Sequence, residues 1–205
     1  MQAFFLVADD IMDGSHTRRG KDCWYKRNEI GMKAVNDFIF LETCIYTLLD
    51  KHFSAKEFYL HLLDAFLYTT RHTAMGQALD LMSEDKSRQL EDFNMQRYSQ
   101  IVQYKTSYYS FYLPVQLGMI LAGIKDPDMY RLARSILLAM GHYFQVQDDF
   151  LDCFGDPKIT GKIGTDIQDA KCSWMIVTAM QIANRYNICS RNFQNVRLRL
   201  HFVEI

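Results

Sequence analysis

Two clusters of aspartates share the pattern Asp-Asp-x-x-Asp and lie far apart in the sequence. The clusters are Asp9, Asp10 and Asp13, and Asp148, Asp149 and Asp152. Residues four apart lie on one face of an α-helix, so the first and last aspartate of each cluster point the same way. Carboxylates stacked in this manner repel each other unless a cation lies between them. Oxygen ligands without a Cys or His pair nearby favour Mg²⁺, completed by substrate phosphates.

One such cluster alone is also typical of a solvated acidic helix face. Two copies, each flanked by apolar and aromatic residues, favour a site for several cations and a diphosphate. Arg18 and Arg19 follow the first cluster, where they either neutralise the aspartates or hold phosphate oxygens with their planar groups. Lys105 lies in a segment rich in aromatic residues and needs an anion or a route to solvent. Lys162 lies in a glycine-containing loop over residues 155–166 and is placed to reach an anion.

The composition of the chain indicates long helices. Its 205 residues are 49% hydrophobic, with ten Gly and three Pro, enough for one domain with a sizeable core. A net charge of −1 gives no electrostatic case for nucleic acid. Five dispersed Cys without a Cys-x-x-Cys pair indicate reduced thiols and a cytoplasmic location. The apolar start is short and runs into Asp9, so we expect no signal peptide, and no window is long enough for a membrane span.

Apolar spacing predicts five long helices. We expect them over residues 1–13, over 33–50, from an N-cap at Ser54 to about Met82, over Leu90–Ala122 and over Met129–Asp152. Pro114 should bend the fourth, because proline cannot donate to the carbonyl four residues back. Gln77 and Asp80 share a helix face and need partners if they are buried, which a metal ion and its water shell would supply; taken alone, the pair is interpreted as structural. A further helix is expected to start near Asp166.

Several motifs in fixed order resemble the farnesyl diphosphate synthases of eukaryotes. They are Phe4-Phe5 before DDIMD, Thr17-Arg18-Arg19-Gly20, Lys105-Thr106, FQVQDDFLD and GDPKITGKIGTDIQDAKCSW. The resemblance covers residues 1 to about 175. It implies an all-α fold, an isoprenoid-synthase-type helical bundle around a central cavity, incomplete here. We expect one domain over 1–205, with a family-like core at 1–175 and a divergent tail at 176–205.

The resemblance also implies a reaction. Mg²⁺, with three ions when substrate is bound, would bind the diphosphate of dimethylallyl or geranyl diphosphate, and isopentenyl diphosphate would add to the allylic cation. Asp9, Asp13 and Asp148 would hold the metals, with Asp10, Asp149 and Asp152 in support. By position in the family, the allylic diphosphate would contact Arg18, Lys105, Lys162 and Lys171. Thr106 and Gln145 would lie beside the cationic carbon, and Gln2 and Arg19 would help to bind isopentenyl diphosphate.

Phe4 and Phe5 are the predicted determinants of product length. Phe5 lies one helical turn, about 5.4 Å, before Asp9 on the same face. A prenyl tail whose diphosphate is held at Asp9 would run back along this helix and meet the rings. Two large aromatic residues resemble the stop of a farnesyl-producing enzyme.

The resemblance implies a longer protein and a homodimer. A Gly-Lys-x-x-Arg segment of the family would precede Met1, and the basic end of the family is missing, so the chain is expected to be truncated at both ends. A fragment, a splice product and an error in the gene prediction stay open. Two other functions also stay open: an impaired isoform that binds diphosphates or pairs with the full-length enzyme, and a class I terpene cyclase. The second aspartate cluster favours coupling over cyclisation.

Overall fold

The computed structural model describes residues 1–84 and 93–185, which fold almost entirely into helices. In chain order the elements are α1 (Gln2–Met12), β1 (Thr17–Arg18), β2 (Lys21–Asp22), η1 (Trp24–Lys26), η2 (Gly31–Lys33), α2 (Ala34–Phe53), α3 (Tyr59–Leu81), η3 (Met82–Glu84), α4 (Met95–Val102), the π-helix η5 (Gln103–Tyr112), α5 (Leu113–Leu121), α6 (Pro127–Phe154), α7 (Pro157–Thr160) and α8 (Trp174–Arg185). The two short strands pair antiparallel in a small hairpin. The predicted all-α fold is confirmed for these residues.

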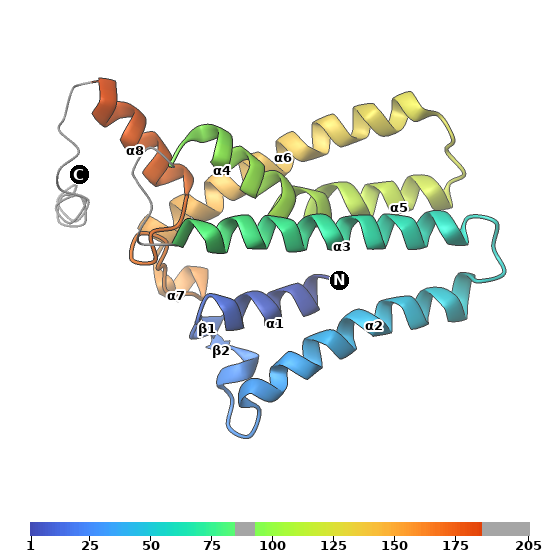
Figure 1. Cartoon of the computed structure of the whole chain (residues 1–205), viewed down its shortest axis with the longest axis horizontal. Helices are drawn as coiled ribbons and strands as arrows, with labels where there is room; N and C mark the ends of the chain where they lie inside the picture. Colours follow the sequence, from blue (N-terminus) through green and yellow to red (C-terminus); the bar gives the residue numbers. More distant parts are fainter. Residues whose placement is uncertain (85–92, 186–205) are drawn as a thin grey trace.

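Helix α3 lies in the middle of the molecule. In Figure 1, α1 and α2 lie on one side of α3, and α5 and α6 lie on the other. The loops that follow both aspartate clusters, together with α7 and α8, gather at the end where α3 finishes (left in Figure 1). Residues from both halves of the sequence therefore meet at one end of the bundle.

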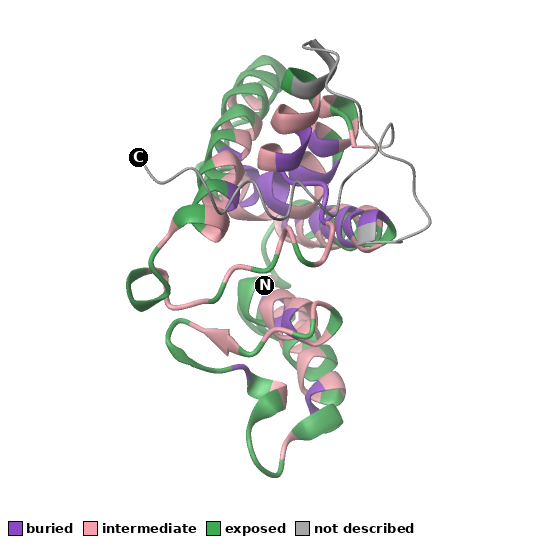
Figure 2. Cartoon of the chain, turned by 90° about the vertical axis from the view of Figure 1, so that its left-hand side faces the viewer, coloured by how far each residue is buried: buried purple, intermediate pink, exposed green. Residues whose placement is uncertain are grey.

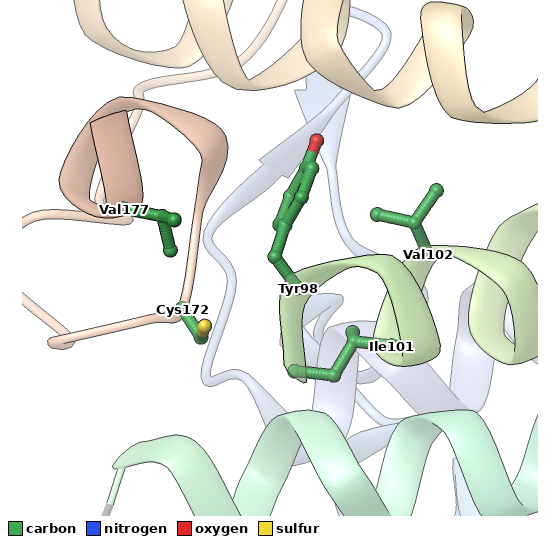
Figure 3. Close-up of a cluster of buried hydrophobic side chains, with 5 residues drawn as sticks. All are labelled: Tyr98, Ile101, Val102, Cys172 and Val177. Carbon is green, nitrogen blue, oxygen red and sulfur yellow. The ribbon is translucent and has the colours of Figure 1, made fainter. Parts of the chain in front are cut away.

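A small hydrophobic cluster fastens α8 to the rest of the bundle. Tyr98, Ile101 and Val102 of α4 contact Cys172 and Val177, from the start of the α8 region (Figure 3). Each of the five is at least nine-tenths buried. Burying such side chains contributes about 1.5–3 kcal/mol each, so this cluster holds the segment before α8 in place.

Burial is concentrated around α3, α4 and η5, whereas the outer faces of α2 and α6 are exposed (Figure 2). Large apolar side chains such as Phe40 on α2 and Tyr143 on α6 are 65% and 72% exposed. Among the described residues, no helix is long and apolar enough to cross a bilayer.

The structure corrects two predicted boundaries. Ser54 is not an N-cap: it is the C-cap of α2, and α3 begins at Tyr59, because a tight turn with Lys56 N donating to Phe53 O occupies the intervening residues. No helix starts at Asp166; a turn there is closed by Lys171 N and Asp166 O, and α8 begins at Trp174. The predicted start at Leu90 lies outside the described residues.

The predicted helix around Lys105 consists of three consecutive parts, α4, η5 and α5. Pro114 lies in the first turn of α5, where a missing N–H costs little. The ten residues before α5, Gln103–Tyr112, adopt the wider π-helical form. The sequence gives no signal for a π-helix of this length, so the prediction of one continuous α-helix is wrong here.

Candidate active site

Both aspartate clusters line one cavity of about 930 Å³. Side chains reach it from α1, α3, η5 and α6 and from the loop before α8. Of the predicted site residues, the cavity is lined by Gln2, Phe4, Phe5, Asp9, Asp13, Arg18, Arg19, Lys105, Thr106, Gln145, Asp148, Asp149, Asp152, Lys162 and Lys171. Asp10 is the predicted site residue that the cavity lining does not include. The fold thus brings distant groups into contact, such as Asp13 and Lys171, which are 158 positions apart in the chain.

The first and last aspartates of the first cluster face lysines across the cavity. Asp9 Oδ1 lies 3.2 Å from Lys105 Nζ, and Asp13 Oδ2 lies 2.5 Å from Lys171 Nζ. Burial alone would raise the pKa of Asp9, but Lys105, Lys171 and Arg18 together lower it. Burial, with the negative charge of Asp9 added, raises the pKa of Asp13. The two stacked carboxylates therefore differ in their hold on a proton, as repulsion between neighbours requires.

The middle aspartate of each cluster is buried and is held by hydrogen bonds from neighbouring segments. Asp10 is 3% exposed, and Arg18 Nε donates to its two oxygens over 2.8 and 3.0 Å. Arg18 Nη2 also donates to Asp9 over 3.1 Å, so the guanidinium clamps the first two aspartates. Asp149, also 3% exposed, accepts from the backbone N–H of Trp174 over 2.7 Å and from Gln145 Nε2 over 2.9 Å. These contacts make both residues anchors of the surrounding loops.

Asp80 of α3 shares the ion pairs of the first cluster, and the interpretation of Gln77 and Asp80 as a structural pair stays a prediction. Lys105 Nζ lies 2.5 Å and Lys171 Nζ 3.6 Å from its Oδ2, so Asp80 shares both lysines with α1. Burial opposes ionisation, but Lys105 and Lys171 hold the pKa of Asp80 below its usual value. Gln77 Nε2 lies 3.4 Å from Asp13 Oδ1. The signal in the sequence was the buried polar pair itself, which needed partners.

The second cluster presents Asp148 and Asp152, bridged by one lysine. Lys162 Nζ lies 3.2 Å from Asp148 Oδ2 and 3.7 Å from Asp152 Oδ1. Asp152 Oδ2 also accepts from the backbone N–H of Asp166 over 3.0 Å. A side chain at Gly164 would place its Cβ 1.8 Å from the Asp152 carbonyl oxygen, so this glycine lets the loop lie directly on α6.

The π-helix places Lys105 and Thr106 at the cavity wall. Thr106 Oγ1 donates to Gln145 Oε1 over 2.8 Å, which joins η5 to α6. Burial would lower the pKa of Lys105, but Asp9, Asp80 and Asp13 raise it well above its usual value. Lys105 is therefore a fixed positive charge among three carboxylates. The predicted partners of the cationic carbon, Thr106 and Gln145, are in contact with each other.

Phe4 and Phe5, the predicted determinants of product length, also line the cavity. The ring of Phe5 packs 4.1 Å from that of Phe4 and 5.7 Å from that of Tyr109, centre to centre. Phe4 is buried and Phe5 half-buried. Tyr109 comes from η5, so rings from two elements close this part of the cavity.

The loops that follow the two clusters touch each other through their backbones. Gly20 N donates to Gly161 O over 2.9 Å. Gly161 has φ +72°, which an L side chain rarely adopts, and a Cβ there would lie 2.9 Å from Gly20 N. The contact fixes the hairpin that carries Arg18 against the loop that carries Lys162.

The charge of the cavity favours cations. Among the described residues that line it, nine are acidic and five are basic. Within the described part of the chain, no group of three His, Cys, Asp or Glu side chains is drawn together into a ready-made metal cage. Mg²⁺ is usually held by one or two carboxylates, with water and substrate phosphates completing the shell, so pairs such as Asp9 with Asp13 fit it.

The pKa of Asp166 provides a test of how closely the acidic side chains are packed in this cavity. Burial, and then the charges of Asp152 and Asp149, raise its pKa to about 8. The folded state therefore holds a proton that the unfolded chain, with a pKa of about 3.9, releases, so Asp166 lowers stability as pH rises from about 4 to 8. In chelator, we expect Asp166→Asn to raise the free energy of unfolding at pH 8 by about 1–3 kcal/mol relative to its effect at pH 5, measured by urea denaturation. An equal effect at both pH values would contradict the proposal that Asp166 carries a proton in the folded state.

Comparison with known proteins decides the family. The family model described as Polyprenyl synthetase matches residues 1–197. The chain belongs to the polyprenyl synthetase family. It is 54% identical over 181 residues to a farnesyl pyrophosphate synthase of Gallus gallus, covering 88% of this chain and 49% of that protein. It is 50% identical over 196 residues to the Homo sapiens farnesyl pyrophosphate synthase, covering 94% and 47%.

Solved structures agree on the fold. The chain is similar to T. brucei farnesyl diphosphate synthase complexed with risedronate, with a TM-score of 0.81 and 39% identity, covering 88% of this chain and 54% of that one. The chain therefore has the all-α isoprenoid-synthase fold of the polyprenyl synthetase family. It spans about half the length of the curated relatives it matches.

Proposed function

We propose that this member of the polyprenyl synthetase family takes part in Mg²⁺-dependent prenyl transfer, condensing isopentenyl diphosphate with dimethylallyl or geranyl diphosphate to give farnesyl diphosphate. The observation that carries the proposal is that Asp9 and Asp13 line the same cavity as Asp148 and Asp152, and that each pair has lysine partners. The farnesyl pyrophosphate synthases that it resembles support this choice of substrates.

The carboxylates would hold the metal ions, three of them when substrate is bound. Asp9, Asp13 and Asp80 would serve one side of the cavity, and Asp148 and Asp152 the other. Bound Mg²⁺ supplies positive charge that neutralises the diphosphate and stabilises it as a leaving group. Asp10 and Asp149 would act indirectly, since Arg18, Gln145 and the Trp174 N–H already hold them.

The basic side chains would bind the anions. Lys105, Lys162 and Lys171 lie at the cavity and keep their charge, because neighbouring carboxylates raise the pKa of each. They would stabilise the negative charge that grows on the departing pyrophosphate. Arg18 is expected to contact the allylic diphosphate, and Arg19 and Gln2 the isopentenyl diphosphate.

The hydroxyl of Thr106 and the amide of Gln145 would face the reacting carbon. As the C–O bond of the allylic substrate breaks, its electrons leave with pyrophosphate, and the oxygens of Thr106 and Gln145 would orient towards the positive carbon. The double bond of isopentenyl diphosphate then forms the new C–C bond, and a proton passes to pyrophosphate. The hydrogen bond between Thr106 and Gln145 keeps these oxygens aligned.

Two further expectations follow the family. A homodimer is proposed from the resemblance. A cytoplasmic location is proposed because Cys23, Cys44, Cys153 and Cys172 are free thiols in the structure. Cys189 lies outside the described residues.

The test is incubation with labelled isopentenyl diphosphate and geranyl diphosphate, with Mg²⁺ or with a chelator. Chelator-sensitive farnesyl diphosphate supports the proposal. Saturable Mg²⁺-dependent binding of geranyl diphosphate without product would reduce it to a binding function, and a cyclised hydrocarbon would indicate a terpene cyclase. The absence of both binding and product would reject it.

Phe5→Ala should lengthen the product. The ring lies one turn before Asp9 and packs against Phe4 and Tyr109, so its removal opens space for another isoprene unit. In a competent version of the enzyme, we expect geranylgeranyl diphosphate to appear beside farnesyl diphosphate on reversed-phase chromatography, and more of it in Phe4→Ala/Phe5→Ala. An unchanged C15 product in both variants would reject the aromatic stop.

A further inference from the structure

A basic and partly apolar surface covers the tip of the molecule that the β1–β2 hairpin, η1 and η2 form. It lies in the lower part of Figure 1, where α2 begins, and most of this segment is coloured as exposed in Figure 2. The helices η1 and η2 contact each other there. This surface, the basic tip, presents the exposed side chains of Lys21, Trp24, Lys26, Arg27, Met32 and Lys33.

The charge of this segment differs from that of the whole chain. Residues 19–33 contain five basic side chains and two acids, Asp22 and Glu29, which gives a net charge of +3 in a chain whose total is −1. Among the described residues, no carboxylate forms an ion pair with any of the five. Lys33 Nζ donates instead to the backbone oxygen of Glu29 over 3.0 Å. The positive charge therefore faces solvent, where an external anionic surface can meet it.

Apolar side chains are exposed among these cations. Met32 is 65% exposed and Trp24 is 37% exposed. Trp24 Nε1 donates to Asp37 Oδ2 over 2.8 Å, which fixes the indole on the first turn of α2. The guanidinium of Arg27 lies 5.2 Å from the centre of the Trp24 ring. A tryptophan with a satisfied N–H and an exposed ring, beside long basic side chains, is typical of the boundary between water and lipid.

We propose that the basic tip is a docking surface for an anionic lipid bilayer. Its cations contact acidic headgroups, an attraction that acts within about one Debye length of the bilayer. Trp24 and Met32 enter the boundary between headgroups and acyl chains. Charge and apolar insertion are two weak signals that act together, so the attachment is peripheral and reversible.

Single-stranded nucleic acid is another anionic partner for cations beside an aromatic ring, because its bases stack on such rings. Stacking needs a free ring face, and Arg27 already lies over the ring of Trp24. The total charge of −1 adds no long-range attraction for a polyanion. Met32 has no counterpart in base stacking, whereas an acyl chain accommodates it. These observations favour lipid.

Co-sedimentation of the full chain with vesicles tests the proposal. We expect at least about tenfold stronger binding to phosphatidylcholine vesicles that contain about 30% phosphatidylserine than to pure phosphatidylcholine vesicles. Raising NaCl from about 0.1 M to about 1 M shortens the Debye length from about 10 Å to about 3 Å and should weaken this binding about tenfold. Equal sedimentation with both kinds of vesicle, or sedimentation with neither, would overturn the proposal.

Charge reversal locates the surface. Lys26→Glu/Arg27→Glu should weaken binding to the anionic vesicles at least about tenfold. The matched control, Lys51→Glu/Lys56→Glu, makes the same change in charge at exposed positions near the far end of α2, about 30 Å away. The control should bind within about threefold of the unmodified chain, because screening limits the reach of its charges. Equal losses in the two variants would show an effect of net charge alone and reject the basic tip.

Two further variants keep the test decisive. Lys21→Glu/Lys33→Glu reverses two other cations of the basic tip and replaces the first variant if circular dichroism shows that one to be unfolded. The chain has two tryptophans, Trp24 and Trp174. Tryptophan emission should shift to shorter wavelength on anionic vesicles, and Trp24→Phe should abolish the shift. A shift that persists in Trp24→Phe would place the lipid at Trp174 and reject the basic tip.

Competition separates the basic tip from the aspartate-lined cavity. Saturating pyrophosphate with Mg²⁺, at constant ionic strength, should leave vesicle binding within about twofold, because its site is the cavity. Release of the chain by pyrophosphate would show that headgroups bind in the cavity and would reject the basic tip. Binding to a single-stranded oligonucleotide without binding to vesicles would replace lipid by nucleic acid. The proposed prenyl transfer is tested separately, so either proposal can fail while the other stands.

Discussion

Asp9→Asn and Asp148→Asn are each expected to weaken Mg²⁺-dependent binding of diphosphate about 100-fold, equivalent to about 2.7 kcal/mol. Each removes one negative charge from a different side of the cavity, and a neutral amide is a poor ligand for Mg²⁺. Calorimetric titration with pyrophosphate, with and without Mg²⁺, measures the effect.

The fold should survive the first of these changes, because its basic neighbours keep other partners. Arg18 retains Asp10, and Lys105 retains Asp80. Asp64→Asn, on an exposed position of α3, is the matched control and should bind as the unmodified chain does. Normal Mg²⁺-dependent binding by Asp148→Asn would show that the second cluster does not serve the site, and the model of two facing clusters would be wrong.

Gly76→Ala should lower the free energy of unfolding by about 3 kcal/mol, since overpacking a tight contact commonly costs 1–3 kcal/mol or more. Here the added Cβ would lie 2.1 Å from Lys105 N and 2.5 Å from the Tyr104 carbonyl carbon, which are backbone atoms that cannot rotate away. Moving η5 off α3 would also displace Lys105 from Asp80. Urea denaturation measures the first effect, and pyrophosphate titration the second.

Gly118→Ala provides the control for helix propensity. Gly118 is an exposed residue of α5, and a Cβ there would meet nothing within 4 Å. Alanine in place of glycine within a helix stabilises by about 0.5–1 kcal/mol, so this variant should be slightly more stable. If both variants show the same change, close packing at Gly76 is not the cause.

The spacing of apolar residues predicted the helices that carry the aspartates, and the order of the motifs along the chain predicted the family. Helical spacing placed Asp9 with Asp13, because a period of 3.6 residues is set within one segment. The start of α3 was predicted wrongly because Ser54 has the chemistry of an N-cap, and the sequence around it does not reveal that α2 continues to Phe53. The π-helix escaped prediction because a local pattern does not reveal contacts between distant segments, such as that of the η5 backbone with Gly76.

The roles within each cluster also required the structure. Spacing treats Asp9 and Asp10 as equal neighbours, but Arg18 turns Asp10 into a buried anchor. Asp80 was interpreted as structural because its partners, Lys105 and Lys171, are 25 and 91 positions away in the chain. Pairings of that kind depend on how helices dock, and no local pattern encodes them.

The backbone hydrogen bond from Gly20 to Gly161 has a consequence for motion. Because it joins main-chain atoms of segments 141 positions apart, no change of rotamer can open it. The two sides of the cavity can separate there only if a whole loop lifts, and the Gly20 amide then meets solvent. Hydrogen–deuterium exchange at the Gly20 amide should therefore report the opening of the contact between these two loops.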